Sequence, residues 1–444
     1  MIKKALQIGV ILIFLIICIF VLFLILFPAR KEKNNIIVTG ISNPGKILIY
    51  SWNGYSFERE YIDTNYKFVH TVRIGDIYNN GKNVIVAGVG NSFYGPPFGC
   101  SVEVYEKSDK EWKKTVIDNV GDLRCKDLTI GDIDNDGKNE LVLGTHGEGI
   151  IKVYKWNGKN WSSQILEKNW IEQVDKTGNM NHKVPREELT YDCIDQSAVH
   201  IVKVGDTDND GRNELITSVS SPLEFKGEDI SYLNLYKWNG KEWQRTVIDN
   251  QTGKEFRSIV VGDVYNKGKN VILVGSGLMW TKKEYASLTV YEWVDGKWNK
   301  HVVEDGILEK NMKGLALGDA YNKGKNVIVL ATGFPQGLVY TYEWNKNKFE
   351  KVFVGNMSEI FKVYADNNMF SDIMQNSMEA QIKDTDGDGK NEIIVSGLTH
   401  TKKFGWEATT LGFTVMFKWD KNKWNYEVLD KYSVLGMDVG MIGQ

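Results

Sequence analysis

The sequence predicts an all-β fold in which seven four-stranded units form a closed ring. Two elements recur along the 444-residue chain. The first is a pair of apolar runs joined by an acidic or acid-derived loop, which occurs six times, and the second is a tight turn between two aromatic residues, which occurs seven times. The composition agrees with this interpretation, because 43 Gly, 14 Trp and 20 Tyr with only 7 Pro favour strands and turns over helices.

The chain begins with a predicted membrane anchor. Residues 8–27 are twenty consecutive apolar or glycine residues, long enough for a helix to cross a bilayer. A cleaved signal peptide is the alternative, although its apolar region is usually shorter. The chain is therefore divided into a tail (1–7), a transmembrane helix (8–27), a linker (28–34) and a repeat domain (35–444). We expect a single-pass protein of the cell membrane with the repeat domain on the extracytoplasmic side.

The first repeated element is typified by LTIGD-IDNDGKNE-LVLG, in which a glycine-containing loop separates two apolar strands. Apolar runs of this length that flank a Gly-rich turn are typical of paired strands. The six copies begin at Asp76, Asp132, Asp206, Asp263, Asp319 and Asp384.

The second repeated element is a hairpin such as YKWNGKNW, with an Asn-Gly or similar turn between alternating aromatic residues. A weaker copy ends at Trp112. The other six place two aromatic residues five positions apart, at Trp52/Phe57, Trp156/Trp161, Trp238/Trp243, Trp293/Trp298, Trp344/Phe349 and Trp419/Trp424.

Each repeat thus reads as strand 1, acidic loop, strand 2, variable loop, strand 3, hairpin turn and strand 4. Four-stranded units that repeat along most of the chain predict the blades of a β-propeller. The first hairpin has a strand 2 before it, at residues 35–40, but no strand 1, whereas residues 435–441 align with a strand 1 that has no partner. We expect the two chain ends to complete one blade, giving a seven-bladed β-propeller.

The loops resemble the calcium loops of integrin-α-like FG-GAP repeats, also grouped as VCBS repeats, over nearly everything after the apolar segment. The literal FG and GAP halves of the family name are missing, so the resemblance implies the fold and the metal loops and not an integrin-like ligand. In full copies, oxygens at loop positions one, three, five and nine suit Ca²⁺, and Gly at position six lets the chain turn. Up to three structural Ca²⁺ sites are expected, with ligands Asp132, Asp134, Asp136 and Glu140; Asp206, Asp208, Asp210 and Glu214; and Asp384, Asp386, Asp388 and Glu392.

Three copies of the loop have lost these acids. Positions three, five and nine carry Tyr78, Asn80 and Val84 in one copy, and Tyr, Lys and Val in the copies that begin at Asp263 and Asp319. Because valine cannot coordinate a cation, we expect these turns to hold without metal, through their glycine, the surviving aspartate and packing of the tyrosine.

Loop lengths distinguish the two faces of the predicted ring. The acidic loops and hairpin turns are short, whereas the 2–3 and 4–1 connections are long and rich in aromatic and charged residues, as recognition loops usually are. Six residues before the loop aspartates, where strand 1 enters the ring, basic residues dominate. The predicted ligand-binding set is His70, Lys126, His200, Arg257 and Lys313, with Trp170, Trp280 and Trp406 available to stack on sugar rings.

These features favour a cell-adhesion or binding module for a glycan or protein ligand on the membrane-distal face, and not an enzyme, because no catalytic set is assembled. A calcium-dependent polysaccharide lyase acting on acidic glycans and a subunit of an envelope complex remain the alternatives. With 54 basic and 57 acidic residues, no global field favours nucleic acid. Cys100, Cys125 and Cys193 permit one disulfide, whose pairing the sequence leaves open.

Overall fold

The computed structural model describes residues 35–91, 99–108, 111–168, 197–220, 230–277, 286–308, 311–333, 336–364, 373–401 and 411–442, all within the unit Asn35–Gln444. The predicted tail, membrane span and linker lie outside these residues. Among the residues that are described, no helix has the length and apolar character needed to cross a membrane.

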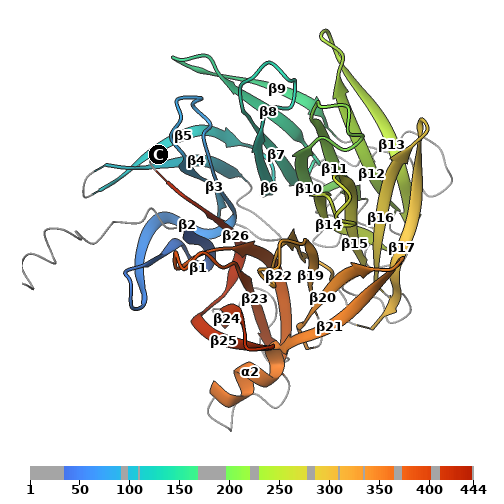
Figure 1. The fold of residues 1–444 in the computed structure, drawn as a ribbon. Coiled ribbons are helices and arrows are strands. Elements are labelled where there is room, and N and C mark those ends of the chain that lie inside the picture. The colour runs from blue at the N-terminus through green and yellow to red at the C-terminus, as the bar shows by residue number, and fades with distance from the viewer. Residues whose placement is uncertain are drawn as a thin grey trace, which may run out of the picture. The chain divides into compact units, whose positions relative to one another are not determined.

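Each of the two long strands at the start of this unit pairs with one strand through its first half and with another through its second half. β1 (Ile36–Trp52) pairs with β26 (Val434–Gly440) through its first half and with β2 (Phe57–Gly75) through its second half. β2 then continues past Phe68 to pair with β3 (Val84–Gly90). With these two strands divided, the described strands form seven antiparallel groups of four (Figure 1).

The groups run from the innermost strand outward. The first consists of β26, the two halves of β1 and the first half of β2, and the second of the other half of β2 with β3, β4 (Cys100–Lys107) and β5 (Trp112–Val120). The others are β6 (Arg124–Gly131), β7 (Glu140–Gly147), β8 (Ile151–Trp156), β9 (Trp161–Glu167); β10 (Ser197–Gly205), β11 (Glu214–Ser220), β12 (Ile230–Trp238), β13 (Trp243–Thr252); β14 (Glu255–Gly262), β15 (Val271–Gly277), β16 (Ala286–Val294), β17 (Lys297–Ile307); β18 (Gly314–Gly318), β19 (Val327–Ala331), β20 (Leu338–Asn345), β21 (Lys348–Asn356); and β22 (Ile373–Lys383), β23 (Glu392–Thr401), β24 (Leu411–Asp420), β25 (Lys423–Tyr432).

The innermost strands close a ring. In order, β26, β2, β6, β10, β14, β18 and β22 each contact the next, and β22 contacts β26. The predicted pairing of the chain ends is confirmed, because Ile36 lies opposite Gly440 and Val38 opposite Asp438 in one antiparallel ladder. Within this unit the four-stranded groups are the blades of a β-propeller, a fold that leaves only short sheet edges open.

The core lies between neighbouring blades. Strands β3, β11 and β15 are buried along their whole length, whereas an outermost strand such as β17 is mostly exposed. The glycine before five of the six loop aspartates permits this close approach, and only Asp384 follows a lysine instead. A Cβ on Gly262 would come within 2.6 Å of Leu317 in the next blade, and one on Gly205 within 2.9 Å of Val261. The Gly-Asp pair of the repeat therefore has a packing role as well as a loop role.

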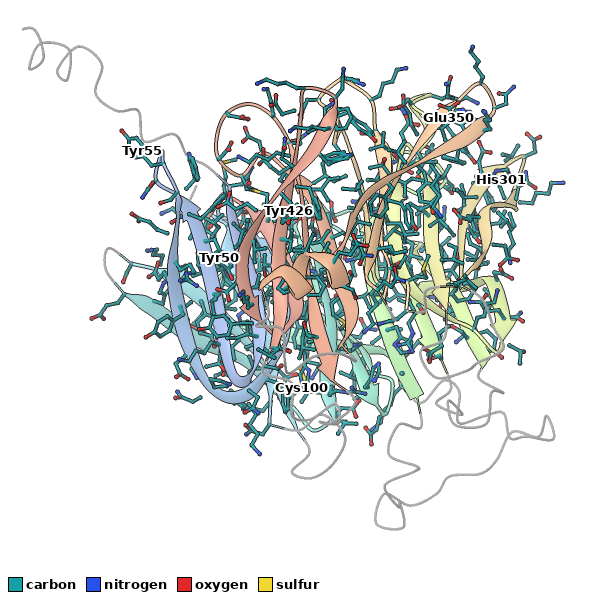
Figure 2. All side chains as sticks on the ribbon, turned by 90° about the horizontal axis from the view of Figure 1, so that it is seen from below. Tyr50, Tyr55, Cys100, His301, Glu350 and Tyr426 are labelled. Atoms are coloured by element: carbon teal, nitrogen blue, oxygen red, sulfur yellow. A yellow bond between two sulfur atoms is a disulfide. The ribbon has the colours of Figure 1, made fainter. Side chains whose placement is uncertain are left out.

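Two features of the described residues were not specified by the repeats. A disulfide joins Cys100 of β4 to Cys125 of β6 and so links two blades, while Cys193 lies outside the described residues. A helix, α2 (Met357–Tyr364), interrupts a connection expected to be loop, because Met357, Ile360 and Phe361 pack into the core of the last two blades. In Figure 2, Tyr55, in a hairpin turn, and Cys100, at the start of a third strand, lie at opposite ends of the sheets, as two distinct faces require.

Candidate functional site

All six acidic-type loops share one backbone framework. The first aspartate of each accepts hydrogen bonds from two backbone N–H groups inside its own loop. Asp132, for example, accepts from Asp136 at 3.0 Å and Gly137 at 2.9 Å, and Asp263 does the same with Lys267 and Gly268 at 3.0 and 2.6 Å. The glycine at position six has a positive φ in each copy, for example 86° at Gly137. Because this bonding needs no cation, the stripped loops hold the same turn as the full ones.

The three full loops gather carboxylates closely enough to hold a metal ion. Within each, ligand oxygens lie within 4.8 Å of one another, from Asp132, Asp134 and Asp136; Asp206, Asp208 and Asp210; and Asp384, Asp386 and Glu392. Asp134 and Asp208 have side chains only 9% exposed, and each keeps one buried carboxylate oxygen without a hydrogen-bond partner among the described residues. An unpaired oxygen buried among other carboxylates fits a hard cation. Ca²⁺ bound here would neutralise the loop and hold its two strands together.

Each full loop is also contacted by a lysine of the third strand of its blade, which the sequence patterns did not indicate. Lys155, one residue before the hairpin Trp156, forms ion pairs with Asp134 and, at 3.3 Å, with Glu140. Lys237 pairs in the same way with Asp208 and, at 3.2 Å, with Glu214. Lys418 pairs with Asp386. Part of each expected ligand set, Asp134 and Glu140, Asp208 and Glu214, and Asp386, therefore contacts an ammonium group.

The stripped loops are held by aromatic packing onto the next blade. The ring of Tyr78 lies 5.1 Å from that of Trp156, and the rings of Tyr265 and Trp344 lie 4.7 Å apart. Tyr321 packs likewise on Trp419, at 4.8 Å. This agrees with the packing role expected for the tyrosine. It also explains how the stripped loops join neighbouring blades without a metal.

Asparagines connect successive loops in a latch that the sequence analysis missed. The side-chain amide of Asn79 donates to the carbonyl of Asn139 in the next loop, and the Asn139 N–H donates back to the Asn79 Oδ1 at 2.6 Å. The Asn139 side chain also donates to the carbonyl of Asp76. Four further loop pairs repeat these three bonds, with latch pairs Asn135/Asn213, Asn209/Asn270, Asn266/Asn326 and Asn322/Asn391. The recurrence of Asn at loop positions four and eight was a usable signal.

At the other end of the innermost strands, a recurring β-bulge holds the basic residues of the predicted ligand set. The ladder slips by one residue at His70, Lys126, His200 and Arg257, and again at Met378. A bulge turns one side chain out of the regular alternation, here in the same register of successive blades. Lys313 stands just before β18 in the equivalent place.

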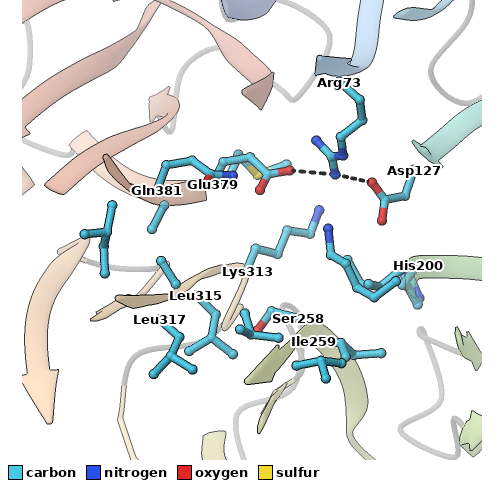
Figure 3. A pocket seen from close by; sticks show the side chains of 18 of the residues that line it. Arg73, Asp127, His200, Ser258, Ile259, Lys313, Leu315, Leu317, Glu379 and Gln381 are labelled. Carbon is cyan, nitrogen blue, oxygen red and sulfur yellow. Dashed lines mark hydrogen bonds and ion pairs between the residues drawn. The ribbon is translucent and has the colours of Figure 1, made fainter. Parts of the chain in front are cut away.

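These positions converge on an axial cavity of about 510 Å³ (Figure 3). Arg257 does not line it and instead forms an ion pair with Glu255. Trp170, Trp280 and Trp406 lie outside the described residues. The cavity lining includes His70, Lys126, His200, Lys313, Met378 and Leu435 from the seven equivalent positions.

A buried hydrogen-bond chain links three blades beside the cavity. Arg124 lies 2.5 Å from Nδ1 of His146, whose Nε2 lies 3.3 Å from Nδ1 of His200. The His200 Nε2 in turn lies 3.1 Å from Glu255. Since arginine can only donate and the carboxylate accepts, both histidines carry their proton on Nε2. Burial, together with Arg124 for His146 and Arg257 for His200, lowers the pKa of each well below 6.5, so both rings are neutral.

A second layer of charges lies deeper in the cavity. Arg73 forms ion pairs with Asp127 and, at 3.8 Å, with Glu379, and it donates to the carbonyl of Leu128 at 2.7 Å. Figure 3 shows Arg73 between the two carboxylates, with Lys313 nearby. Arg124, Asp127 and Glu379 were not identified from the sequence, although Arg124 and Asp127 stand two residues and one residue from the predicted Lys126.

Two lysines in the cavity wall perturb each other. Burial, reinforced by Arg124, lowers the pKa of Lys126 to about 8. Burial and the nearby Lys126 lower the pKa of Lys313 well below its usual 10.5. The positive charge of Lys126 disfavours that of Lys313, so the neutral amine of Lys313 is favoured. Such a pair can bind an anion, or give and take a proton near neutral pH.

The repeats match a known family. The family model for integrin-alpha FG-GAP repeat-containing protein 2 matches residues 63–184, which include two of the loops described above. This chain carries FG-GAP repeats. The first FG-GAP loop with a full acid set, which begins at Asp132, lies inside the matched region.

The FG-GAP propeller also resembles a curated enzyme. It is 24% identical over 304 residues to the rhamnogalacturonan endolyase YesW of Bacillus subtilis (strain 168). The match covers 65% of this chain and 40% of the endolyase, so the chain spans well under half of that enzyme's length.

Solved structures of similar shape share the fold at low sequence identity. A protein from Lactobacillus plantarum superposes with a TM-score of 0.54 at 8% identity, over 91% of this chain and 99% of that one. A hypothetical selenium-binding protein from Sulfolobus tokodaii has a TM-score of 0.53 at 11% identity, with 93% and 94% covered. At these identities the comparison shows the propeller architecture alone.

Proposed function

We propose that this FG-GAP propeller is a binding module whose axial cavity takes a carboxylate-bearing ligand, such as an acidic glycan. The observation that supports it is the recurring bulge, which brings His70, Lys126 and His200 from three separate blades to one cavity. A bulge interrupts the regular alternation of side chains along a strand. Bulges are frequent beside active sites, where they turn a side chain toward a ligand.

The charge balance around the mouth supports an anion. Arg124 and Arg257 lie close enough to Lys126 and Lys313 to help lower the pKa of both lysines, and Glu255 forms an ion pair with Arg257. The deeper Asp127 and Glu379 already share Arg73. Like charges held together destabilise a fold, and a bound carboxylate would relieve the repulsion between the two lysines.

The proposed setting is the cell surface. The apolar segment 8–27 would anchor the chain in the membrane, and the propeller would lie on the extracytoplasmic side. The disulfide between Cys100 and Cys125 supports this placement, because such bonds persist in oxidising compartments.

The test is the double replacement Lys126→Met/Lys313→Met in the full-length chain, with trigalacturonate as the probe. We expect its affinity to fall at least about tenfold, because both lysines that line the cavity, and the positive charge they carry, are lost. Neutral galactotriose should bind neither protein. The matched control is Lys138→Met/Lys390→Met, which removes two exposed lysines from the acidic loops. Titration calorimetry on all three proteins decides, and equal affinity of the cavity variant and the parent would refute the proposal.

The same experiment has a pH dependence. The ammonium form of Lys126 is lost as the pH rises through about 8. We therefore expect trigalacturonate to bind the parent protein more weakly at pH 9 than at pH 7. The difference should disappear in the Lys126→Met/Lys313→Met variant.

A lyase is the second candidate, favoured by the two lysines and by the similarity to an endolyase. In β-elimination a base takes the proton α to the uronate carboxylate, the C4–O bond breaks, a C4–C5 double bond forms and the leaving oxygen gains a proton. A neutral amine could be the base, and a neighbouring cation could stabilise the carboxylate as charge develops on it. Incubation with polygalacturonate and with rhamnogalacturonan tests this, because the unsaturated product absorbs ultraviolet light. No increase in absorbance would leave binding as the function.

A further inference from the structure

One position on the third strand of each blade varies together with the chemistry of the loop. It is the residue immediately before the first hairpin aromatic, or before Lys107 in the weaker copy. In the three blades with full acidic loops it is Lys155, Lys237 and Lys418. In the three blades with stripped loops it is Glu106, Glu292 and Glu343. The six blades divide without exception.

The lysine contacts explain half of this correlation. Lys155 reaches three carboxylates of its own loop, those of Asp134, Asp136 and Glu140, and the latter two lie at 3.8 and 3.3 Å. Lys237 repeats the pattern with Asp210 at 3.7 Å and Glu214 at 3.2 Å. The ammonium thus lies among oxygens that would also ligate a divalent ion. One positive charge cannot balance four carboxylates, and the unpaired oxygens of Asp134 and Asp208 remain.

The stripped blades account for the other half. There the glutamate lies close enough to the loop tyrosine to help raise its pKa, after burial: Glu106 acts on Tyr78 and Glu292 on Tyr265. A lysine would have no carboxylate partner at this place, and a glutamate in a full loop would add a fifth negative charge. Each strand residue is therefore matched to the charge of its loop.

We propose that Lys155, Lys237 and Lys418 are built-in counter-cations that compete with calcium for the FG-GAP loops. Without metal, the ammonium neutralises part of the loop and lets it keep its turn. When a divalent ion binds, the lysine withdraws, and its side chain, 39% exposed for Lys155 and 35% for Lys418, can swing its charge into solvent. The lysine thus sets both the metal-free stability of the blade and its affinity for metal.

The test compares two pairs of substitutions that affect the same two loops of the full-length chain. Lys155→Met/Lys418→Met removes the proposed counter-cations, and Lys138→Met/Lys390→Met removes exposed lysines of the same loops as the control. Calcium binding is measured by titration calorimetry, and thermal unfolding is measured with a chelator and with excess Ca²⁺.

For the first pair we expect Ca²⁺ to bind at least about tenfold more tightly, because a competing positive charge is lost. Its melting temperature should fall in chelator and recover with Ca²⁺, whereas the control should match the parent in both measurements. Unchanged or weaker Ca²⁺ binding in the first pair would overturn the proposal. If that pair does not fold, the single substitution Lys237→Met, which leaves the other two loops intact, is subject to the same criteria.

Discussion

A chain that ends at Ser433 will fail to form the closed propeller. The missing residues include β26, the innermost strand of the blade to which both chain ends contribute. Val434, Leu435, Met437 and Val439 are all less than 9% exposed, and burying four such side chains contributes about 6 to 12 kcal/mol. This is as large as the whole stability of a typical domain, about 5 to 15 kcal/mol. Circular dichroism and the soluble yield of the truncated chain measure the effect.

Two controls make this prediction specific to ring closure. Removing only residues 443–444 leaves β26 whole, and we expect no loss of stability. A synthetic peptide of residues 434–444, added to the truncated chain during refolding, should restore part of the native spectrum because its partner residues 36–41 are present. A cooperative thermal transition in the Ser433 truncation at the parent's temperature would contradict the expected role of the strand.

Replacing Arg73 by Met should destabilise the propeller by about 3 to 5 kcal/mol, the usual cost of removing one partner from a buried ion pair. Asp127 and Glu379 would lose their cation, and the carbonyl of Leu128 would lose a donor. Urea unfolding at neutral pH measures the change. Arg73→Met/Asp127→Asn should recover part of the loss, because one buried negative charge is removed. Equal stability of Arg73→Met and the parent would show that the pair does not support the fold.

The loss caused by Arg73→Met should depend on pH. Burial raises the pKa values of Glu379 and Asp438, and Arg73 opposes that rise. Without Arg73 both pKa values go higher, so the carboxyl groups favour their protonated form in the folded state. Stability from an acid with a raised pKa is present at low pH and is lost as the pH rises through the folded-state value. The difference in the free energy of unfolding between parent and variant should therefore be smaller at pH 5 than at pH 8.

The propeller could be predicted from the sequence because its signals are local. Turn residues at fixed offsets gave the hairpins, as in the pairing of Trp156 with Trp161, and a count of unpaired strands gave the closure that joins residues 36–41 to β26. The loop framework also followed from Asp and Gly positions. These features depend on backbone geometry that a few residues determine.

The missing parts of the candidate site depend on long-range contacts. His146 and Glu255 lie 109 residues apart in the chain but meet His200 from opposite sides, and no local pattern indicates this. A bulge is likewise invisible in a strand read alone, because the slip is defined by the partner strand. The Lys155 contact was missed for a different reason: a lysine beside a hairpin is usually solvent-exposed, and its correlation with the loop acids appears only when all blades are aligned.

The asparagine latches do not depend on the carboxylates that distinguish full loops from stripped loops. Each latch uses the amides of positions four and eight and backbone groups, and none of its bonds involves the carboxylates that distinguish a full loop from a stripped one. A blade can therefore gain or lose its acids, and the matching strand residue, without altering these asparagine bonds to its neighbours. The loop type can change one blade at a time while the latches still join the loops, in agreement with the presence of both loop types in one chain.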